Sequence, residues 1–171
     1  MQKNFSYPLT VADLPLSTQT YKIRADKGDL KKIAEILKIP AVNSLQADIS
    51  LKINRDKCLL DVWGRVWADV VLMSVVSLEQ FESSYDFDFA LVYDTKATFE
   101  SQREEESEWD DDLPDIIIGG KIDLCDITIE QLALQLEDHP RKEGEIFEFE
   151  AEFDASEPLK NNPFDILSKL K

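Results

Sequence analysis

Residues Leu45-Gln46-Ala47-Asp48-Ile49-Ser50-Leu51-Lys52-Ile53 alternate apolar and polar side chains without a break. A period of two places successive side chains on opposite faces of a β-strand. The pattern therefore predicts a strand with one face turned towards a core. That face would carry Leu45, Ala47, Ile49, Leu51 and Ile53.

Two further stretches repeat this period after short connections. Residues 59–73 place apolar side chains at even-numbered positions, and residues 85–93 alternate phenylalanine and leucine with aspartate. Three consecutive strands joined by short links predict an antiparallel β-meander from Leu45 to Tyr93. The even-numbered apolar row of the middle strand comprises Leu60, Val62, Val66, Ala68, Val70 and Leu72.

Two stretches carry the period of a helix instead. The apolar spacing i, i+3, i+4, i+7 occurs at Leu30, Ile33, Ala34 and Leu37, and again at Ile129, Leu132, Ala133 and Leu136. We expect the first helix to be capped by Asp26 or Asp29 and to end before Pro40. For the second helix, the cap is either Asp126 or a capping box formed by Thr128 and Gln131.

The remaining segments complete the expected organisation. Residues 18–24 predict an edge strand, and residues 115–124 predict a strand or a short hairpin bent at Gly119 and Gly120. Residues 100–115 hold nine carboxylates and a single cation, Arg103, which predicts a mobile acidic loop. Residues 145–153 alternate apolar residues with glutamate, either as a last edge strand or as a tail that orders on a partner.

These elements predict an α+β fold. We expect an antiparallel β-meander, partly closed towards a barrel, with two packed helices and a short C-terminal helix. Residues 1–157 would form a single domain that includes the acidic loop, and residues 158–171 would form a tail ending in the short helix. A length of 171 residues suits one domain with a substantial core.

Composition restricts the possible functions. The net charge is -16, of which residues 1–60 contribute +4 and the rest -20, so avid nucleic-acid binding over the whole surface is excluded. The apolar runs are too short for a membrane span, and the first eight residues lack the features of a signal peptide, so we expect a cytoplasmic protein. Cys58 and Cys125 stand far apart without nearby ligands, so no disulfide, metal or other cofactor is expected.

Two groups of side chains are candidate binding residues within the domain. Lys27, Lys31 and Lys32 give the first helix a basic outer side, which is either a solvated face or a contact for RNA or an acidic partner. Trp63, Arg65 and Trp67 share one face of the middle strand. They could stack on bases, as aromatic side chains do on single-strand-binding sheets, or they could pack under a helix with Arg65 between the rings.

The C-terminus offers a third candidate. Asn162 resembles a helix cap, Pro163 suits the first helical position, and an apolar stripe of Phe164, Leu167 and Leu170 follows. A helix this short is not stable alone, so it must dock either on its own domain or on a partner.

Catalysis is not expected. Asp123, Asp126 and Glu130 could suggest an acid/base site, but acidic residues at a helix N-terminus account for them as well. His139 is the single histidine, and no nucleophile accompanies it in the sequence. Asp110, Asp111 and Asp112 lack the glycine and the alternating spacing of a calcium loop. We therefore predict that the protein is not an enzyme.

Several segments of the chain form a recognisable series: 113–124, 129–134, 139–142 and the Asn-Pro-Phe ending of 162–170. In this order and spacing they resemble the YceD family. The strand at 62–66 and the segment at 75–79 fit the family as well, and together the matching segments cover most of the chain.

The resemblance implies a bacterial protein needed for the accumulation of large-subunit ribosomal RNA, with relatives in plastids and no known enzymatic activity. Many members of the family carry a Cys-x-x-Cys pair after the long strand. Ser74 and Ser77 occupy that place here, so a zinc site is not expected.

Two functions follow from the residues and the resemblance together. The first is a non-catalytic factor for large-subunit ribosome biogenesis that binds ribosomal RNA, a basic ribosomal protein or both. In that arrangement Lys27, Lys31 and Lys32, with Arg141 and Lys142, would face RNA, while the acidic loop would meet the basic protein. The alternative is a protein-interaction adaptor that docks a partner through its acidic loop and C-terminal helix.

Overall fold

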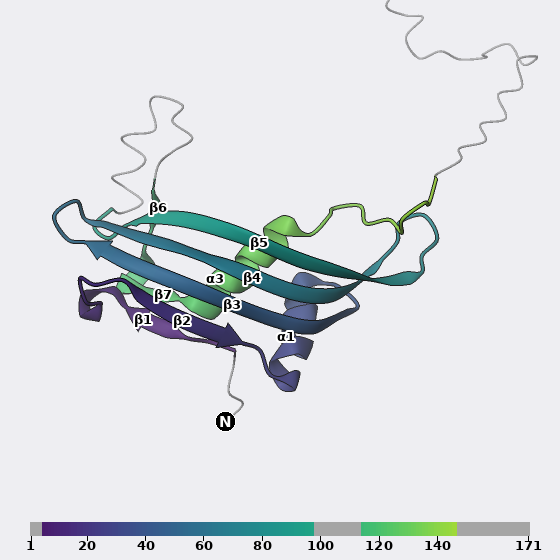
Figure 1. Ribbon diagram of the computed structural model, residues 1–171, viewed down its shortest axis with the longest axis horizontal. Coiled ribbons are helices and arrows are strands. Elements are labelled where there is room, and N and C mark those ends of the chain that lie inside the picture. Colours follow the sequence, from purple (N-terminus) through teal and green to yellow (C-terminus); the bar gives the residue numbers. More distant parts are fainter. Residues whose placement is uncertain (1–4, 98–113, 147–171) are drawn as a thin grey trace, which may run out of the picture.

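The computed structural model describes residues 5–97 and 114–146. Its main feature is a five-stranded sheet with the order β2-β3-β4-β5-β6 (Figure 1). The strands β2 to β5 each pair antiparallel with their neighbours in sequence, whereas β6 pairs parallel with the end of β5. Their bounds are β2 Gln19–Arg24, β3 Ala41–Asn54, β4 Leu59–Met73, β5 Gln80–Asp94 and β6 Asp115–Ile116.

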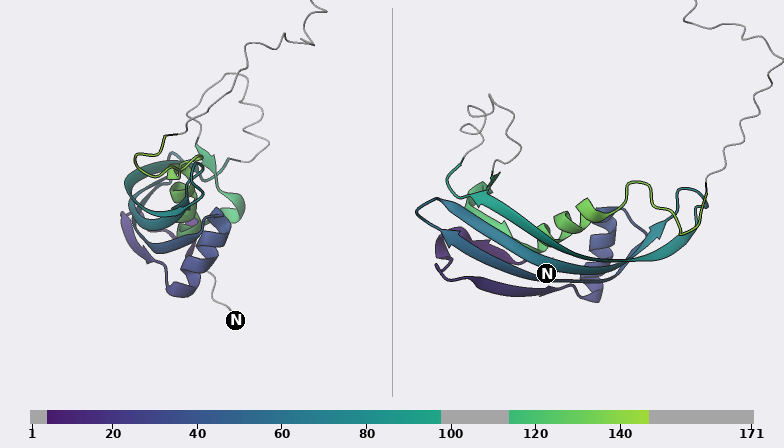
Figure 2. Two further views of the ribbon diagram at one scale, coloured as in Figure 1. Left: turned by 90° about the vertical axis from the view of Figure 1, so that its right-hand side faces the viewer. Right: turned by 45° about the horizontal axis from the view of Figure 1, so that its top comes forward.

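A second, two-stranded sheet pairs β1 (Pro8–Thr10) with β7 (Lys121–Asp123). Two helices, α1 (Lys27–Leu37) and α3 (Leu124–Gln135), lie on one face of the large sheet, which curves around them (Figure 2). Two short 3-10 helices, η1 (Val11–Asp13) and η2 (Ile118–Gly120), complete the described elements. The expected α+β class is confirmed.

The core lies between the concave face of the sheet and the helices. The predicted inward rows of β3 and β4 are buried, from Ile49 at 0% exposure to Ile53 at 8%. Ile33 of α1 and Leu132 of α3 are fully buried against the same cluster. Period-two alternation thus identified the inner face of the long strands correctly.

The expected partial closure into a barrel is wrong. In the described part of the chain, the sheet ends at β2 on one side and at β6 on the other, and these two edges do not pair. The two helices fill the concave side that a closing sheet would have to enclose (Figure 2). The sheet therefore curves around a layer of helices and does not close on itself.

The helix starts were predicted with mixed success. Asp26, one of the two expected caps, caps α1 and forms a capping box with Asp29, and Lys38 ends the helix in a left-handed conformation. For α3 the expected caps were wrong, because Asp123 accepts the N–H groups of Cys125 and Asp126. The Thr128 hydroxyl is buried inside the helix and donates to the Leu124 carbonyl oxygen at 2.7 Å.

Two other local expectations need correction. Residues 115–124 form no hairpin, because β6 joins the large sheet while β7 joins β1 in the small one. Gly119 and Gly120 between them adopt positive φ angles of 66° and 67°. In α3, Ala133 is exposed despite its place in the apolar stripe, since the first turns of this helix are buried on most sides and its end is not.

Gly64 interrupts the inner row of β4 for a steric reason. A Cβ atom there would lie 2.5 Å from the Asp48 carbonyl oxygen and 3.0 Å from Cε1 of Phe89. The Phe89 ring of β5 therefore fills the space that a side chain at position 64 would need. Phe89, at 8% exposure, is also the most buried residue of β5.

We predict that Gly64→Ala lowers the free energy of unfolding by about 1–3 kcal/mol, because the added methyl group overpacks a site bounded by backbone. Denaturant unfolding measures this change. Gly28→Ala is the matched control, because its Cβ would meet only the Asp26 side chain, at 3.3 Å. We expect the control to change stability by less than about 1 kcal/mol. Equal midpoints for the two variants would contradict this account of Gly64.

Candidate partner-binding surface

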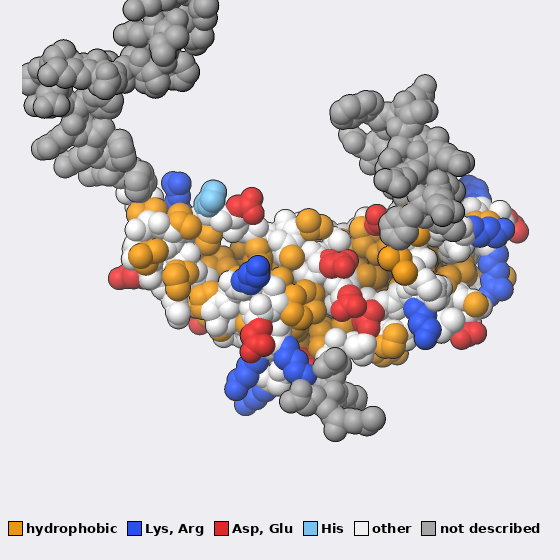
Figure 3. All heavy atoms as spheres, turned by 180° about the vertical axis from the view of Figure 1, so that it is seen from behind, with side chains coloured by type: hydrophobic (Ala, Val, Ile, Leu, Met, Phe, Trp, Pro, Cys, Tyr) orange, Lys and Arg blue, Asp and Glu red, His pale blue; other side chains and the backbone are white. Residues whose placement is uncertain are grey.

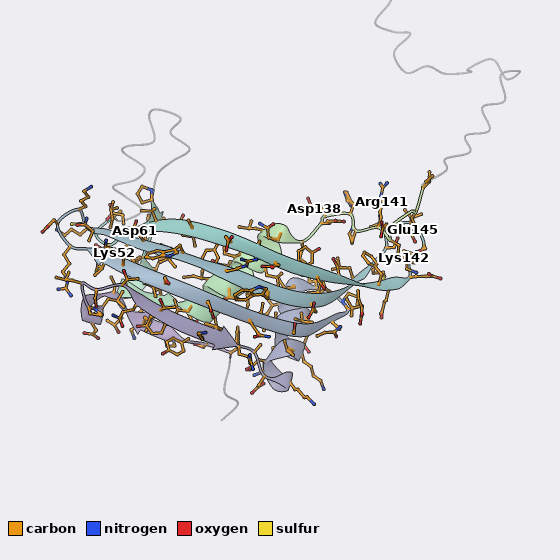
Figure 4. The ribbon with its side chains drawn as sticks, in the orientation of Figure 1. Lys52, Asp61, Asp138, Arg141, Lys142 and Glu145 are labelled. Atoms are coloured by element: carbon orange, nitrogen blue, oxygen red, sulfur yellow. The ribbon has the colours of Figure 1, made fainter. Side chains whose placement is uncertain are left out.

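The convex face of the sheet is divided by charge. All its cations except Arg65 stand on β2 and β3, and all its carboxylates except Asp48 stand on β4 and β5. The cations are Lys22, Arg24, Lys52 and Arg65, and the carboxylates are Asp48, Asp61, Asp69, Glu82, Asp86, Asp88 and Asp94. Figure 4 shows Lys52 and Asp61 together at the β3–β4 end. The β5 side of this face is therefore acidic.

One row of alternating charge crosses four strands of the sheet. Lys22, Asp48, Arg65 and Asp88 are direct cross-strand neighbours on β2, β3, β4 and β5. The Lys22 ammonium lies 3.6 Å from Asp48, and Arg65 Nε lies 4.0 Å from Asp88. Opposite charges placed directly across from each other favour this strand register.

Arg65 has its charge compensated within the sheet. Its Nε and Nη2 donate to the two oxygens of Asp86 at 2.6 and 2.9 Å, a bidentate pair. The hydrogen bond and the positive charge of Arg65 lower the pKa of Asp86 below its usual value. The guanidinium also lies 5.6 Å from the centre of the Trp67 ring. Arg65 is therefore engaged on both sides before any ligand arrives.

Trp63 and Trp67 are not packed under a helix. They are 38% and 36% exposed on the convex face, whereas α1 and α3 lie on the concave face. The interpretation of these tryptophans as a helix-covered cluster was therefore wrong, because the even-numbered residues of β4 are the ones that face the helices. Their rings remain available to a partner, beside the Asp86–Arg65 pair.

The basic helix face is present on the concave side of the molecule. Lys27 and Lys31 are exposed on α1, and Lys32 is half-buried. Figure 3 shows Lys and Arg side chains gathered over this helix. Beside it, an open groove of about 470 Å³ separates α1 from the start of β3. Its walls include Leu30, Ala34 and Val42, and its rim includes Lys31, Glu35 and Lys38.

Arg141 and Lys142 lie elsewhere. The segment 138–146 follows α3 and packs on the β4–β5 connection, beside the β5 side of the sheet, while α1 lies under the β2–β3 side (Figures 2 and 4). The Lys142 ammonium forms an ion pair with Glu79, whereas Arg141 is exposed. The five cations expected to face RNA together are therefore not brought into one patch.

Glu145 holds this segment in place. Its carboxylate accepts hydrogen bonds from the hydroxyls of Ser74 and Ser77 and, at 3.1 Å, from the backbone N–H of Lys142. The Val75 N–H donates to the Pro140 carbonyl oxygen at 2.9 Å. We call these contacts the Glu145 clasp. Ser74 and Ser77 thus bind a carboxylate of this same chain.

The remaining candidates fall into two groups. Asn162, Pro163, Phe164, Leu167 and Leu170 lie outside the described residues, as does nearly all of the acidic loop at 100–115. The carboxylates of Asp126 and Glu130 lie on α3, where burial first and neighbouring carboxylates second raise their pKa values. Asp123 is occupied as the helix cap and also accepts the Tyr7 N–H at 2.9 Å.

Two observations in the described ranges concern thiol chemistry and metal binding. Cys125 is buried, and burial raises the pKa of its thiol to about 12, which keeps it protonated at neutral pH. Within residues 5–97 and 114–146, no three His, Cys, Asp or Glu side chains are placed to hold a metal ion together.

Two features of this surface were missed in the sequence. The Glu145 clasp joins residues about seventy positions apart, and a single glutamate in a glutamate-rich segment gives no signal of such a contact. The second is the free edge of β5, which is described below. The sequence did indicate the long strand. Whether that strand lies at the edge or in the centre of the sheet is decided by pairing between distant segments.

The Glu145 clasp should loosen in acid. Hydrogen bonds from Ser74, then Ser77 and Lys142, lower the pKa of Glu145 below its ordinary value of 4.5. The stabilisation is therefore complete above about pH 4.5 and is lost as pH falls through the lower folded-state value. We predict that protection of the Val75 amide from hydrogen exchange, relative to its intrinsic rate, falls over that window.

Replacing the carboxylate should have the same effect at neutral pH. We expect Glu145→Ala to remove the protection of Val75, while Glu143→Ala, an exposed neighbour on the same segment, retains it. Unchanged protection in Glu145→Ala would show that the carboxylate does not hold the segment.

Comparisons with known proteins identify the family. A family model described as "Large ribosomal RNA subunit accumulation protein YceD" matches residues 62–171, which is more than half of the chain. No curated protein and no solved structure matches significantly. Among the described helices, none is long and apolar enough to cross a membrane. The matched residues begin on β4, take in β5 and the Glu145 clasp, and show that the chain belongs to the YceD family.

Proposed function

We propose that this protein is a non-catalytic factor that supports large-subunit ribosomal RNA accumulation by binding a basic ribosomal protein through the acidic side of its sheet. Family membership supports the connection to large-subunit RNA. The observation that carries the choice of partner is the concentration of carboxylates on the β4–β5 side of the convex face. Opposite charge steers encounter and disfavours wrong partners.

RNA is less well suited to this surface than a basic protein. RNA affinity depends on cations that neutralise phosphates, and nearby carboxylates repel them. Arg65 is already paired with Asp86, and Lys142 is paired with Glu79. The exposed Trp63 and Trp67 could stack on bases, but a base placed there would bring its phosphates close to Asp86 and Asp88.

Binding a ribosomal protein offers a physical route to RNA accumulation. Unassembled ribosomal proteins are strongly basic and bind nucleic acid non-specifically through their charge. An acidic partner masks that charge until the specific RNA site competes for the protein. Ribosomal RNA that receives its ribosomal proteins in order is bound by them sooner. We infer that this earlier protein binding is how the factor supports accumulation of the RNA.

Direct RNA contact through α1 is the second candidate. Lys27 and Lys31 are exposed one helical turn apart, and Lys38 follows at the end of the helix. These side chains lie away from the acidic side of the sheet, so RNA and a protein could be bound at the same time. The adaptor alternative rests on the C-terminal residues 161–171, which lie outside the described ranges.

A capture experiment with purified components tests the proposed function. The tagged full-length protein is incubated with total protein extracted from purified large ribosomal subunits and, separately, with naked large-subunit RNA, over a salt series. We expect one basic ribosomal protein to be retained without RNA, and retention to weaken as salt rises. Retention of naked RNA with no ribosomal protein would contradict the proposal.

The α1 lysines have their own test. We predict that Lys27→Glu with Lys31→Glu weakens any residual RNA retention and reduces its salt dependence, without changing capture of the ribosomal protein. The matched control is Lys52→Glu with Lys57→Glu, which reverses two charges at the β3–β4 end. If both double variants lost RNA retention equally, the loss would come from the change in net charge. In that case α1 would not be an RNA contact.

A further inference from the structure

The strand β5 has a long free edge. It pairs with β4 over its full length from Gln80 to Asp94, but on its other side it pairs with β6 only at Tyr93 and Asp94. Among the described residues, no strand pairs with the stretch 80–92 on that side. Every second residue along this edge therefore directs its N–H and C=O away from the sheet, which is the template that an added strand uses.

The inner face of β5 is incompletely covered. Its inward row contains Phe81, Tyr85, Phe87 and Leu91, all half-buried, and only Phe89 falls below a tenth exposed. The inward rows of β3 and β4, by contrast, are almost entirely buried. Apolar side chains of an added strand would extend this row and remove its exposed part from water.

The outer face of the same strand is acidic. Glu82, Asp86 and Asp88 are exposed there. Ser84 lies between Glu82 and Asp86, and Ala90 follows Asp88 on the same face. Successive side chains of an added strand alternate between the two faces. A strand that fits this edge therefore carries apolar residues on one side and Lys or Arg on the other.

We propose that the free edge of β5 binds an extended, basic segment of a protein partner by strand addition, with apolar side chains turned inward and cations beside Glu82, Asp86 and Asp88. The inference rests on the proposed function, because it says where and how the basic partner binds. Backbone hydrogen bonds supply affinity, and the alternating side chains supply specificity.

Two other occupants fit the charges less well. A second copy of β5 would place its own acidic row beside this one. Residues 145–153 of this chain carry the apolar alternation, but Glu148, Glu150 and Glu152 would stand on the acidic side. Like charges directly opposite each other on neighbouring strands are destabilising.

Hydrogen exchange of the full-length protein tests this proposal directly. The probe is a short, end-capped peptide of alternating lysine and valine, and the control peptide alternates glutamate and valine. We expect the lysine peptide to slow exchange of the edge-facing amides within 80–92 by about tenfold or more, and the control peptide to leave them unchanged. The opposite edge, β2, has Lys22 and Arg24 on its outer face and serves as an internal control.

A charge-reversal pair adds a matched control. Glu82→Lys removes a carboxylate from the edge, whereas Glu35→Lys makes the same change of charge on α1, under the other side of the sheet. Weaker protection by the lysine peptide is expected for Glu82→Lys only. Both variants retain the wild-type fold if their β3 and β4 amides remain protected.

Three results would overturn the proposal. One is an absence of new protection in β5, and another is equal protection of β2 and β5. The third is slow exchange of the edge-facing β5 amides before any peptide is added, which would show that this chain or a second copy already occupies the edge.

If the ribosomal protein is captured but β5 gains no protection, strand addition fails while the proposed function stands. If the peptide binds β5 but no ribosomal protein is captured, the edge accepts a strand but the proposed function fails.

Discussion

The inner side-chain row of β4 is the constraint on which the rest of the structure depends. From Leu60 to Leu72 every even-numbered residue except Gly64 is buried, and the row packs between the sheet neighbours and the helices. A slip of one residue would turn this whole row to water, so register follows from burial. Once β4 is fixed, its odd-numbered residues, including Trp63, Arg65 and Trp67, must face outward. The candidate binding surface is thus a consequence of the core.

The long strands and the first helix were accessible from sequence because their signals are local. Alternation in residues 45–53 and 59–73 identifies faces directly, and Asp26 precedes the apolar spacing of α1 as a cap should. Two of the failures involve contacts between distant segments. The pairing of β7 with β1 and the clasp between Ser74 and Glu145 each depend on where the chain returns in space. The missed cap at Asp123 is a local contact, because this carboxylate accepts the N–H groups of Cys125 and Asp126.

The candidate site shows the same division. Sequence reasoning placed Trp63, Arg65 and Trp67 on one face of β4 but left open whether a helix covers that face, because the position of the helices is a tertiary property. It also grouped Arg141 and Lys142 with the lysines of α1, which the fold separates. The acidic excess was visible in the composition, whereas its concentration along β5 required the cross-strand register. The proposal of a basic protein partner rests on that concentration.

Site-specific photocrosslinking in cells tests the central claim most directly. A photoreactive residue at Ala90, on the outer face of β5, is compared with one at Thr20, on the outer face of β2. The account predicts that position 90 crosslinks to a basic ribosomal protein of the large subunit, that the product survives RNase treatment, and that position 20 gives no such product. Crosslinks from position 90 to RNA, or equal protein crosslinks from both positions, would contradict it.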